Sequence, residues 1–207
     1  MPQVTVMAAE DYSKLETLDS TSPIWDRFFT VAPLVLIGTQ EENGKPDFAP
    51  KHMATPLGLE NYFGFVCTPR HGTYGNVQRT CSFTVSYPRP SGLALASLTA
   101  APRCDDDKPI VGVLDTFDAT RVNGKFVRDA HLYLECELDR VVDGFGSYSL
   151  IAGRVVAAHV HHDALRSTDR DDAEVLLDSP QLAYLHPSRL AVIDKTDGFP
   201  FPAGMKR

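Results

Sequence analysis

Two long stretches of alternating apolar and polar residues constrain the fold of this 207-residue chain most strongly. They are AHLYLECELDRVV, residues 130–142, and YSLIAGRVVAAHVHH, residues 148–162. In the first, Leu134 and Cys136 share one face while Glu135 falls on the other, which is the period of two of a half-buried strand. The two stretches predict a large antiparallel β-component.

Four further β-type runs precede this pair: PLVLIGTQ (33–40), PDFAPKHMA (46–54), NYFGFVCTP (61–69) and SFTVSYP (82–88). Asn-Gly pairs at 43–44 and 123–124 are strong hairpin signals. Short helices are predicted at 23–29, 74–80 and 93–100, a loop at 102–109, and loop or helix at 163–178. This pattern predicts a mainly β fold, a Greek-key-like antiparallel barrel with a few short peripheral helices. We expect one domain over 1–207, with an N-terminal arm (1–30) and a C-terminal tail (195–207).

Charge and cysteine usage restrict the class of protein. The formal net charge is −7, from 20 Lys and Arg against 27 Asp and Glu, and an acidic surface disfavours nucleic-acid binding. The four cysteines form no CxxC pair, which is typical of reduced cytosolic thiols rather than a disulfide framework. The sequence shows no secretory signal and no apolar run of membrane-spanning length. We therefore expect a cytoplasmic protein that binds neither nucleic acid nor membranes.

The stretch CTPRHGTYGNV, residues 67–77, is the first candidate binding site. Arg70 offers a planar set of donors that matches a phosphate. Gly72 allows close backbone approach, and a helix beginning after Thr73 directs free N–H groups to the same place. The sequence indicates either a phosphate site or a turn in which Thr73 caps the helix and Arg70 is a solvated charge.

The second candidate is DFAPKHMA, residues 47–54. Lys51 and His52 are adjacent polar residues in a predicted strand, and Pro50 removes one donor from its hydrogen-bond ladder. The alternatives are an edge strand with two exposed polar residues or one wall of a ligand groove. A single strand joins this candidate to the first, so both could line one groove.

Together these segments resemble the flavin reductase-like family of FMN-binding split barrels, which includes the flavoredoxins. The resemblance covers residues 31–87, with weaker support from 130–163. The family shows an Asn-x-Ala-Pro-x-Ser strand, an Arg-Lys-Asp-Thr-x-x-Asn-Ile loop and a Phe-x-Val-Asn strand. The matching segments here are DFAPKH (47–52), RHGTYGNV (70–77) and FTVS (83–86).

The resemblance implies a homodimer with FMN in a groove between subunits, and an oxidoreductase that passes electrons from NAD(P)H through FMN to a flavin, a partner protein or a small molecule. The flavin would carry the chemistry, so no catalytic side chain is expected. The backbone of 49–54 would hold the ring and Asn76 would brace the loop. The implied cofactor-binding residues are Ala49, Pro50, Lys51, His52, Met53, Ala54, Thr68, Arg70, Thr73 and Asn76.

The departures from the family pattern carry information. Asp47 stands where the family has asparagine, and His52 stands where it has serine. Many members carry Gly-Asp-His before the last long strand, associated with the nicotinamide donor, and the matching place here reads Gly-Ser-Tyr at 146–148. We predict that Lys51 supplies the charge that tunes the flavin potential.

Several alternatives stay open. An FMN-binding protein without NAD(P)H turnover is one, and the same barrel holding deazaflavin, haem or pyridoxal phosphate is another. His159 and His161 share a strand face and could form a metal pair, although exposed or partly buried neutral histidines are the simpler interpretation. Phe199 and Phe201 in the tail could cover a flavin or pack on their own barrel. Trp25 and the Phe28-Phe29 pair are expected in the core or in an interface. The segment CDDDK (104–108) is expected to form a solvated turn.

Overall fold

The computed structural model describes residues 14–102 and 108–202. Within them lie three short α-helices: α1 (Gly72–Thr80), α2 (Leu93–Leu98) and α3 (Asp172–Asp178). The strands are β1 (Thr30–Pro33), β2 (Val35–Gln40), β3 (Pro46–Lys51), β4 (Ala54–Pro56), β5 (Tyr62–Cys67), β6 (Ser82–Pro88), β7 (Thr116–Asp118), β8 (Lys125–Val127), β9 (Ala130–Phe145), β10 (Tyr148–Val160), β11 (Gln181–His186) and β12 (Arg189–Ile193). None of these helices is long and apolar enough to cross a membrane.

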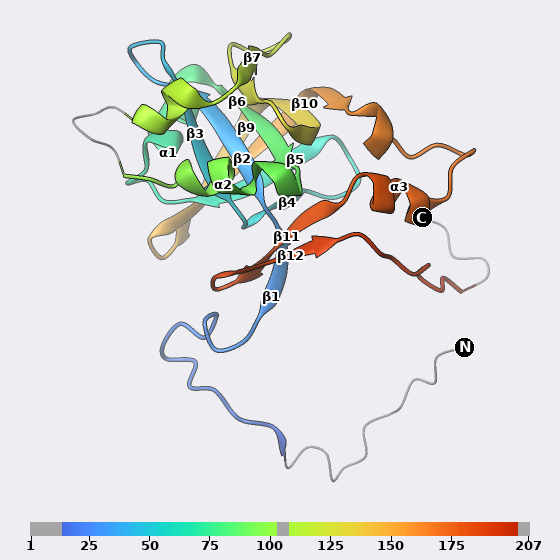
Figure 1. Cartoon of the computed structure of the whole chain (residues 1–207). Coiled ribbons are helices and arrows are strands. Elements are labelled where there is room, and N and C mark those ends of the chain that lie inside the picture. Colours follow the sequence, from blue (N-terminus) through green and yellow to red (C-terminus); the bar gives the residue numbers. More distant parts are fainter. Residues whose placement is uncertain (1–13, 103–107, 203–207) are drawn as a thin grey trace.

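The main body is a seven-stranded antiparallel sheet in the order β3-β2-β6-β9-β10-β5-β4 (Figure 1). Its two end strands, β3 and β4, follow one another in the sequence and are separated only by His52 and Met53. A link of two residues can join the two ends of a seven-stranded sheet only if the sheet curls on itself. The prediction of a mainly β split barrel is thereby confirmed, although β3 and β4 are not paired in the sheet order.

Strand β2 is buried along both faces because each face packs on a separate core. Val35 and Ile37 point into the barrel, where they meet Phe63, Phe83 and other apolar side chains. Leu36 points outward into a second cluster with Phe48, Ala96, Leu114 and Val127. The second core fixes α2 and the segment around β8 on the outside of the barrel, next to β3.

A separate three-stranded sheet, β1-β11-β12, was not predicted from the sequence. Strand β1 pairs with β11 from Thr30↔His186 to Pro33↔Ala183, so segments near the two chain ends meet below the barrel (Figure 1). Only Leu34 separates β1 from β2, so the small sheet is attached directly to the main one.

Three predicted elements need correction. Residues 23–29 form turns rather than a helix, and Trp25 (57% exposed) and Phe29 (62%) lie outside the core. A short helix needs a packing partner to be stable, and every side chain of this segment except Ile24 is exposed. The predicted strand 46–54 is two strands, β3 and β4, with a bend at His52 and Met53. Helix α1 begins at Gly72, two residues earlier than predicted.

Glu135 lies on the face of β9 opposite the barrel core, as its place in the alternation predicted, yet it is fully buried. Its carboxylate accepts hydrogen bonds from the backbone N–H groups of Thr120, Arg121 and Val122 at 2.6–3.1 Å. The Thr120 hydroxyl donates at 2.8 Å, and His159 Nε2 lies 3.0 Å away. The carboxylate therefore fixes the loop between β7 and β8, which covers this face of the sheet.

Candidate functional site

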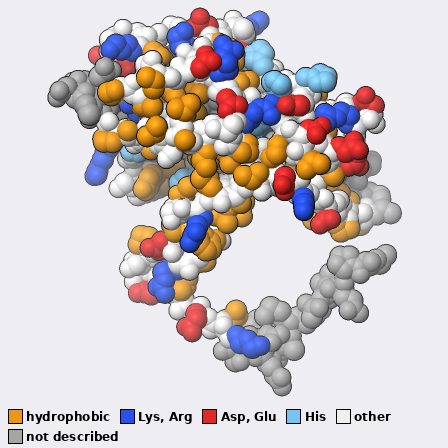
Figure 2. All heavy atoms as spheres, viewed as in Figure 1, with side chains coloured by type: hydrophobic (Ala, Val, Ile, Leu, Met, Phe, Trp, Pro, Cys, Tyr) orange, Lys and Arg blue, Asp and Glu red, His pale blue; other side chains and the backbone are white. Residues whose placement is uncertain are grey.

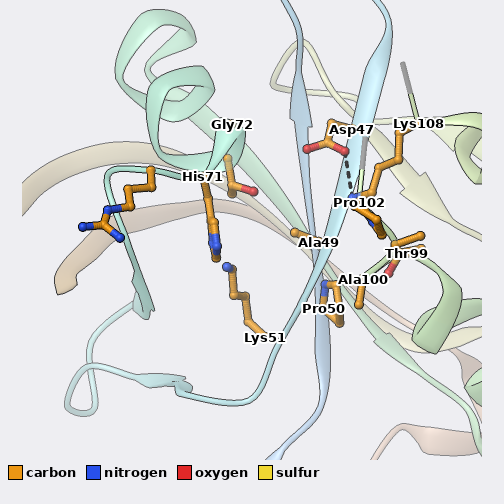
Figure 3. A pocket seen from close by; sticks show the side chains of 13 residues that line it. Asp47, Ala49, Pro50, Lys51, His71, Gly72, Thr99, Ala100, Pro102 and Lys108 are labelled. Carbon is orange, nitrogen blue, oxygen red and sulfur yellow. Dashed lines mark hydrogen bonds and ion pairs between the residues drawn. The ribbon is translucent and has the colours of Figure 1, made fainter. Parts of the chain in front are cut away.

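A groove of about 390 Å³ lies on the outer side of β3. Three parts of the chain line it: β3 itself, the loop from β5 into α1, and residues 99–102 with Lys108 after α2 (Figure 3). The lining residues are Asp47, Ala49, Pro50, Lys51, Arg70, His71, Gly72, Thr73, Thr99, Ala100, Ala101, Pro102 and Lys108. The two sequence candidates, residues 47–54 and 67–77, therefore meet at one groove.

Basic side chains dominate the groove. Lys51 and His71 point toward one another across it (Figure 3). Burial, followed by the nearby charges of Lys51 and Lys108, lowers the pKa of His71 below its ordinary 6.5, so His71 is neutral at pH 7. The cationic character of this wall comes from Lys51 and Arg70.

The third lysine of the groove, Lys108, is held by Asp47. Its ammonium donates to Asp47 Oδ1 at 3.1 Å and to the Phe48 carbonyl oxygen at 2.6 Å. The exposed fractions of the two charged side chains are 11% for Lys108 and 6% for Asp47. Lys108 was predicted to lie in a solvated turn, and that interpretation is wrong for Lys108, whereas residues 103–107 lie outside the described residues.

Helix α1 opens onto the groove at its N-terminus. His71 is the N-cap, no side chain makes a capping hydrogen bond there, and the first turn contains no acidic residue. The first backbone N–H groups of a helix have no partner inside the helix, and the positive end of its dipole attracts anions. Thr73 is the second helical residue and only 2% exposed, so its interpretation as the N-cap is wrong.

Asn76 lies one turn further along α1 and does not line the groove. Its side-chain amide donates to Thr39 Oγ1 and Glu41 Oε1, both at 3.1 Å, and its Oδ1 accepts from Arg79 at 3.3 Å. These contacts attach α1 to the end of β2. Asn76 thus positions the helix that borders the groove.

Replacing Asn76 with alanine is expected to lower the free energy of unfolding by about 1–3 kcal/mol, because a buried amide that bridges two elements is lost. Urea denaturation measures the change. Gln78→Ala on the same helix is the matched control, because the Gln78 side chain is exposed and donates to Tyr74 within the same helix. Equal effects for the two variants would contradict the bracing role.

A second hollow of about 290 Å³ shares Arg70 with the groove. Thr68, Tyr74, Asp143 and the turn between β9 and β10 complete its lining. That turn carries the Gly146-Ser147-Tyr148 segment, where many family members have Gly-Asp-His. Arg70 therefore stands at the border of two hollows, and Thr68 belongs to the second of them.

The remaining predicted residues of the strand lie elsewhere. His52 lines a third, mostly apolar cavity of about 240 Å³, in which its ring lies 4.4 Å from that of Tyr184. Met53 is 46% exposed at the bend, and Ala54 is buried in the barrel core. The structure thus brings Ala49, Pro50, Lys51, Arg70 and Thr73 together in the groove and separates the other five predicted residues from it.

The contribution of residues 99–102 and Lys108 to the groove was not predicted from the sequence. Lys108 is 61 positions from Asp47, and no local pattern connects the two. Among the described residues, no group of three or more His, Cys, Asp and Glu is placed to hold a metal ion. His159 instead contacts Glu135, and His161 Nδ1 lies 2.8 Å from Asp163 Oδ1.

Comparisons with known proteins identify a family and a fold. The family described as "Flavin reductase like domain" matches residues 28–186. The flavoredoxin from Methanosarcina acetivorans superposes with a TM-score of 0.74 at 16% identity, covering 92% of this chain and 97% of that one. Nitrilotriacetate monooxygenase component B from Bacillus cereus gives 0.70 at 20% identity, with 83% and 88% covered. The 2-nitrobenzoate 2-nitroreductase of Pseudomonas fluorescens gives 0.74 at 15% identity, with 98% and 99% covered.

Proposed function

The chain belongs to the flavin reductase-like family, and from this premise we propose that it is an oxidoreductase that binds FMN and takes electrons from NADH or NADPH. The acceptor would be a free flavin, a redox partner protein or a small molecule. The observation that supports this most directly is a groove in which Lys51, Arg70 and the uncapped start of α1 converge.

The charges of the groove fit a phosphate monoester. Lys51 and Arg70 supply two positive charges, Lys108 is offset by Asp47, and His71 is neutral. A phosphate monoester carries a charge of about −1.5 to −2 at pH 7. This negative charge nearly equals the positive charge of Lys51 and Arg70 together. FMN has such a phosphate, whereas riboflavin has none.

Each part of the groove has a separate task in this proposal. Arg70, Thr73 and the first N–H groups of α1 would hold the phosphate, and Ala49, Pro50 and Lys51 of β3 would hold the ring system. Bound FMN supplies the redox chemistry, accepting a hydride from the nicotinamide and releasing electrons to the acceptor. The protein orients the ligands, and no side chain is required as an acid or base.

Lys51→Met is expected to lower the two-electron potential of the bound flavin by roughly 30 mV, since losing a preference of about 1.4 kcal/mol for the reduced anion corresponds to that shift. Spectroelectrochemical titration measures the potential. Lys45→Met, at an exposed position in the turn between β2 and β3, serves as the control. An unchanged potential in the Lys51 variant would show that Lys51 does not tune the flavin.

The proposed activity is tested by adding FMN to the purified protein and recording its spectrum before and after anaerobic NADH or NADPH. We expect the bound flavin to bleach with at least one donor. A second function, FMN binding without turnover, is favoured by Ser147 and Tyr148 at the place of the Asp-His pair. Tight FMN binding with no bleaching would select that second function.

We further propose a cytoplasmic homodimer. Hydrophobic side chains gather where the small sheet meets the barrel (Figure 2). Val31 (70% exposed) and Ile193 (39%) share one face of the small sheet, and Trp25 and Phe29 of the preceding segment are also exposed. Exposed apolar side chains in such numbers are typical of an interface. Three cysteines of the described residues are free thiols, which agrees with a reducing compartment. Sedimentation velocity tests the dimer.

The tail is a candidate to complete the site of the other subunit. Phe199 is 73% exposed, and its ring lies 4.6 Å from that of Phe201. A stiff segment between prolines presents these two rings together. Residues 203–207 lie outside the described part of the chain.

A further inference from the structure

The bend between β3 and β4 brings the barrel into contact with the small sheet through aromatic rings. The centroid of the His52 ring lies 4.4 Å from that of Tyr184 and 5.3 Å from that of His186, and the two imidazoles are stacked at an angle of 22°. His52 lies at the bend of the main sheet, whereas Tyr184 and His186 belong to β11. Three rings therefore join two sheets that share no strand.

The imidazole of His52 takes part in this contact as a neutral group. Burial, followed by the nearby charges of His186 and Lys51, lowers the pKa of His52 below its ordinary 6.5, so His52 is neutral at pH 7. Its Nε2 is buried and has no hydrogen-bond partner among the described residues. Protonation makes both ring nitrogens of a histidine donors. A protonated His52 would therefore hold a positive charge and a buried N–H donor without an acceptor, which is costly.

The groups around His52 do not compensate such a charge. Lys51 on β3 and His186 on β11 both bring positive charge, and the Tyr184 hydroxyl already donates to the Pro187 carbonyl oxygen. Helix α2 and strand β12 present side chains without charge to the cavity beside His52, namely Leu93, Ala96, Ser97 and Leu190. No carboxylate is among these groups, so protonation of His52 opposes the packing of its ring on β11.

The small sheet depends on its contact with the barrel. Its strands β1, β11 and β12 have four, six and five residues, and so small a sheet is stable only when one face is packed on another element. Regions with few packing contacts open before the rest of a protein. Weakening the contact at His52 should therefore expose the backbone of the small sheet first.

We propose that His52 is an acid-sensitive contact, which holds the small sheet on the barrel while the imidazole is neutral and releases that sheet when the imidazole is protonated. This inference does not depend on the function proposed above. A histidine whose pKa is lowered in the folded state stabilises that state fully above its ordinary pKa. The stabilisation by His52 is thus lost as pH falls below 6.5. Pro50 lines both the groove and the His52 cavity, so release of the small sheet acts beside the groove wall.

Hydrogen exchange followed by mass spectrometry tests the proposal on the full-length protein without added ligand. Exchange is measured at about pH 7.5 and about pH 5, and each rate is divided by the chemical rate of an unstructured amide at the same pH. The protection of residues 181–193 should fall by about threefold to thirtyfold at the lower pH. The upper limit holds for a single histidine that has an ordinary pKa in the open state and stays neutral in the closed state.

Two substitutions remove the titration of His52. His52→Phe keeps an aromatic ring, and His52→Gln is uncharged without a ring. In both variants the small sheet should have the same protection at the two pH values. His162→Phe is the matched control, because His162 is exposed just after β10 and does not line the cavity. The control should keep the acid response of the wild type.

Strand β6 serves as the internal reference, because it lies inside the main sheet. Its protection should change less than that of the small sheet. Unchanged protection of the small sheet in the wild type would overturn the proposal, and so would a fall that persists in both His52 variants. An equal fall in β6 would overturn it too, since acid would then unfold the barrel as a whole.

Discussion

Replacing Glu135 with glutamine is expected to lower the free energy of unfolding by about 3 kcal/mol, because the NH2 group of the amide faces backbone donors that now bond a carboxylate. Three N–H groups and the Thr120 hydroxyl converge on the two oxygens of Glu135, and glutamine keeps only one acceptor. For a chain of this size, about 3 kcal/mol corresponds to a melting temperature roughly 6–12 °C lower.

Glu137→Gln is the matched control for this substitution. Glu137 lies two residues further along β9 and pairs with Arg154 at 2.5 Å, but both side chains are about half exposed, at 52% and 54%. Exposed pairs contribute about 0–1 kcal/mol. Calorimetry on both variants, with the wild type, gives the comparison. Similar melting temperatures for the two variants would show that the loop does not depend on Glu135.

The same carboxylate predicts how stability depends on pH. Burial by itself raises the pKa of Glu135, but hydrogen bonds from His159, Thr120 and Arg121 outweigh it and lower the pKa from 4.5 to about 2. A group with a lowered pKa in the folded state stabilises fully above its unfolded value. The contribution of Glu135 is therefore lost as pH falls from about 4.5 toward about 2, and the Gln variant should lack this part of the acid sensitivity.

Arg70→Met is expected to weaken FMN binding by about tenfold to a hundredfold and to leave riboflavin binding nearly unchanged, because a charge-assisted hydrogen bond contributes about 1.5–3 kcal/mol. Isothermal titration calorimetry with both flavins measures the two affinities. The result would identify Arg70 as the phosphate contact of the groove.

The control for Arg70 is Arg154→Met, which removes the same charge from an exposed position on β10. It should leave both affinities unchanged. Arg70 also lines the second hollow, so an equal loss of FMN and riboflavin would indicate that Arg70 serves the ring side rather than the phosphate. That outcome would contradict the phosphate assignment.

The sequence predicted best those elements whose conformation depends on residues adjacent to one another in the chain. The Asn-Gly signal at 43–44 is confirmed as the turn between β2 and β3, where Gly44 has a φ of +81° and Gln40 pairs with Pro46. A positive φ carries no steric penalty in glycine. The alternation in β9 and β10 similarly predicted the longest strands, because period and length are properties of the segment alone.

Features that join distant segments could not be predicted in this way. The burial of Glu135 depends on Thr120, which lies 15 residues earlier in the chain, and Asp47 meets Lys108, which lies 61 positions away. The short strands β11 and β12 were not predicted from the sequence. Their conformation depends on pairing with β1 and with each other, and their own residue pattern does not indicate a strand. The start of α1 was misplaced because no side chain caps it.

The pairing of β1 with β11 has a consequence for biosynthesis. All seven strands of the main sheet have left the ribosome once Val160 has emerged, but Thr30 must wait for His186 before it finds its partner. Contacts this distant in sequence form slowly. During translation the seven-stranded sheet can therefore form while β1 is still unpaired. The pairing of β1 with the β11–β12 hairpin is then the last step of folding.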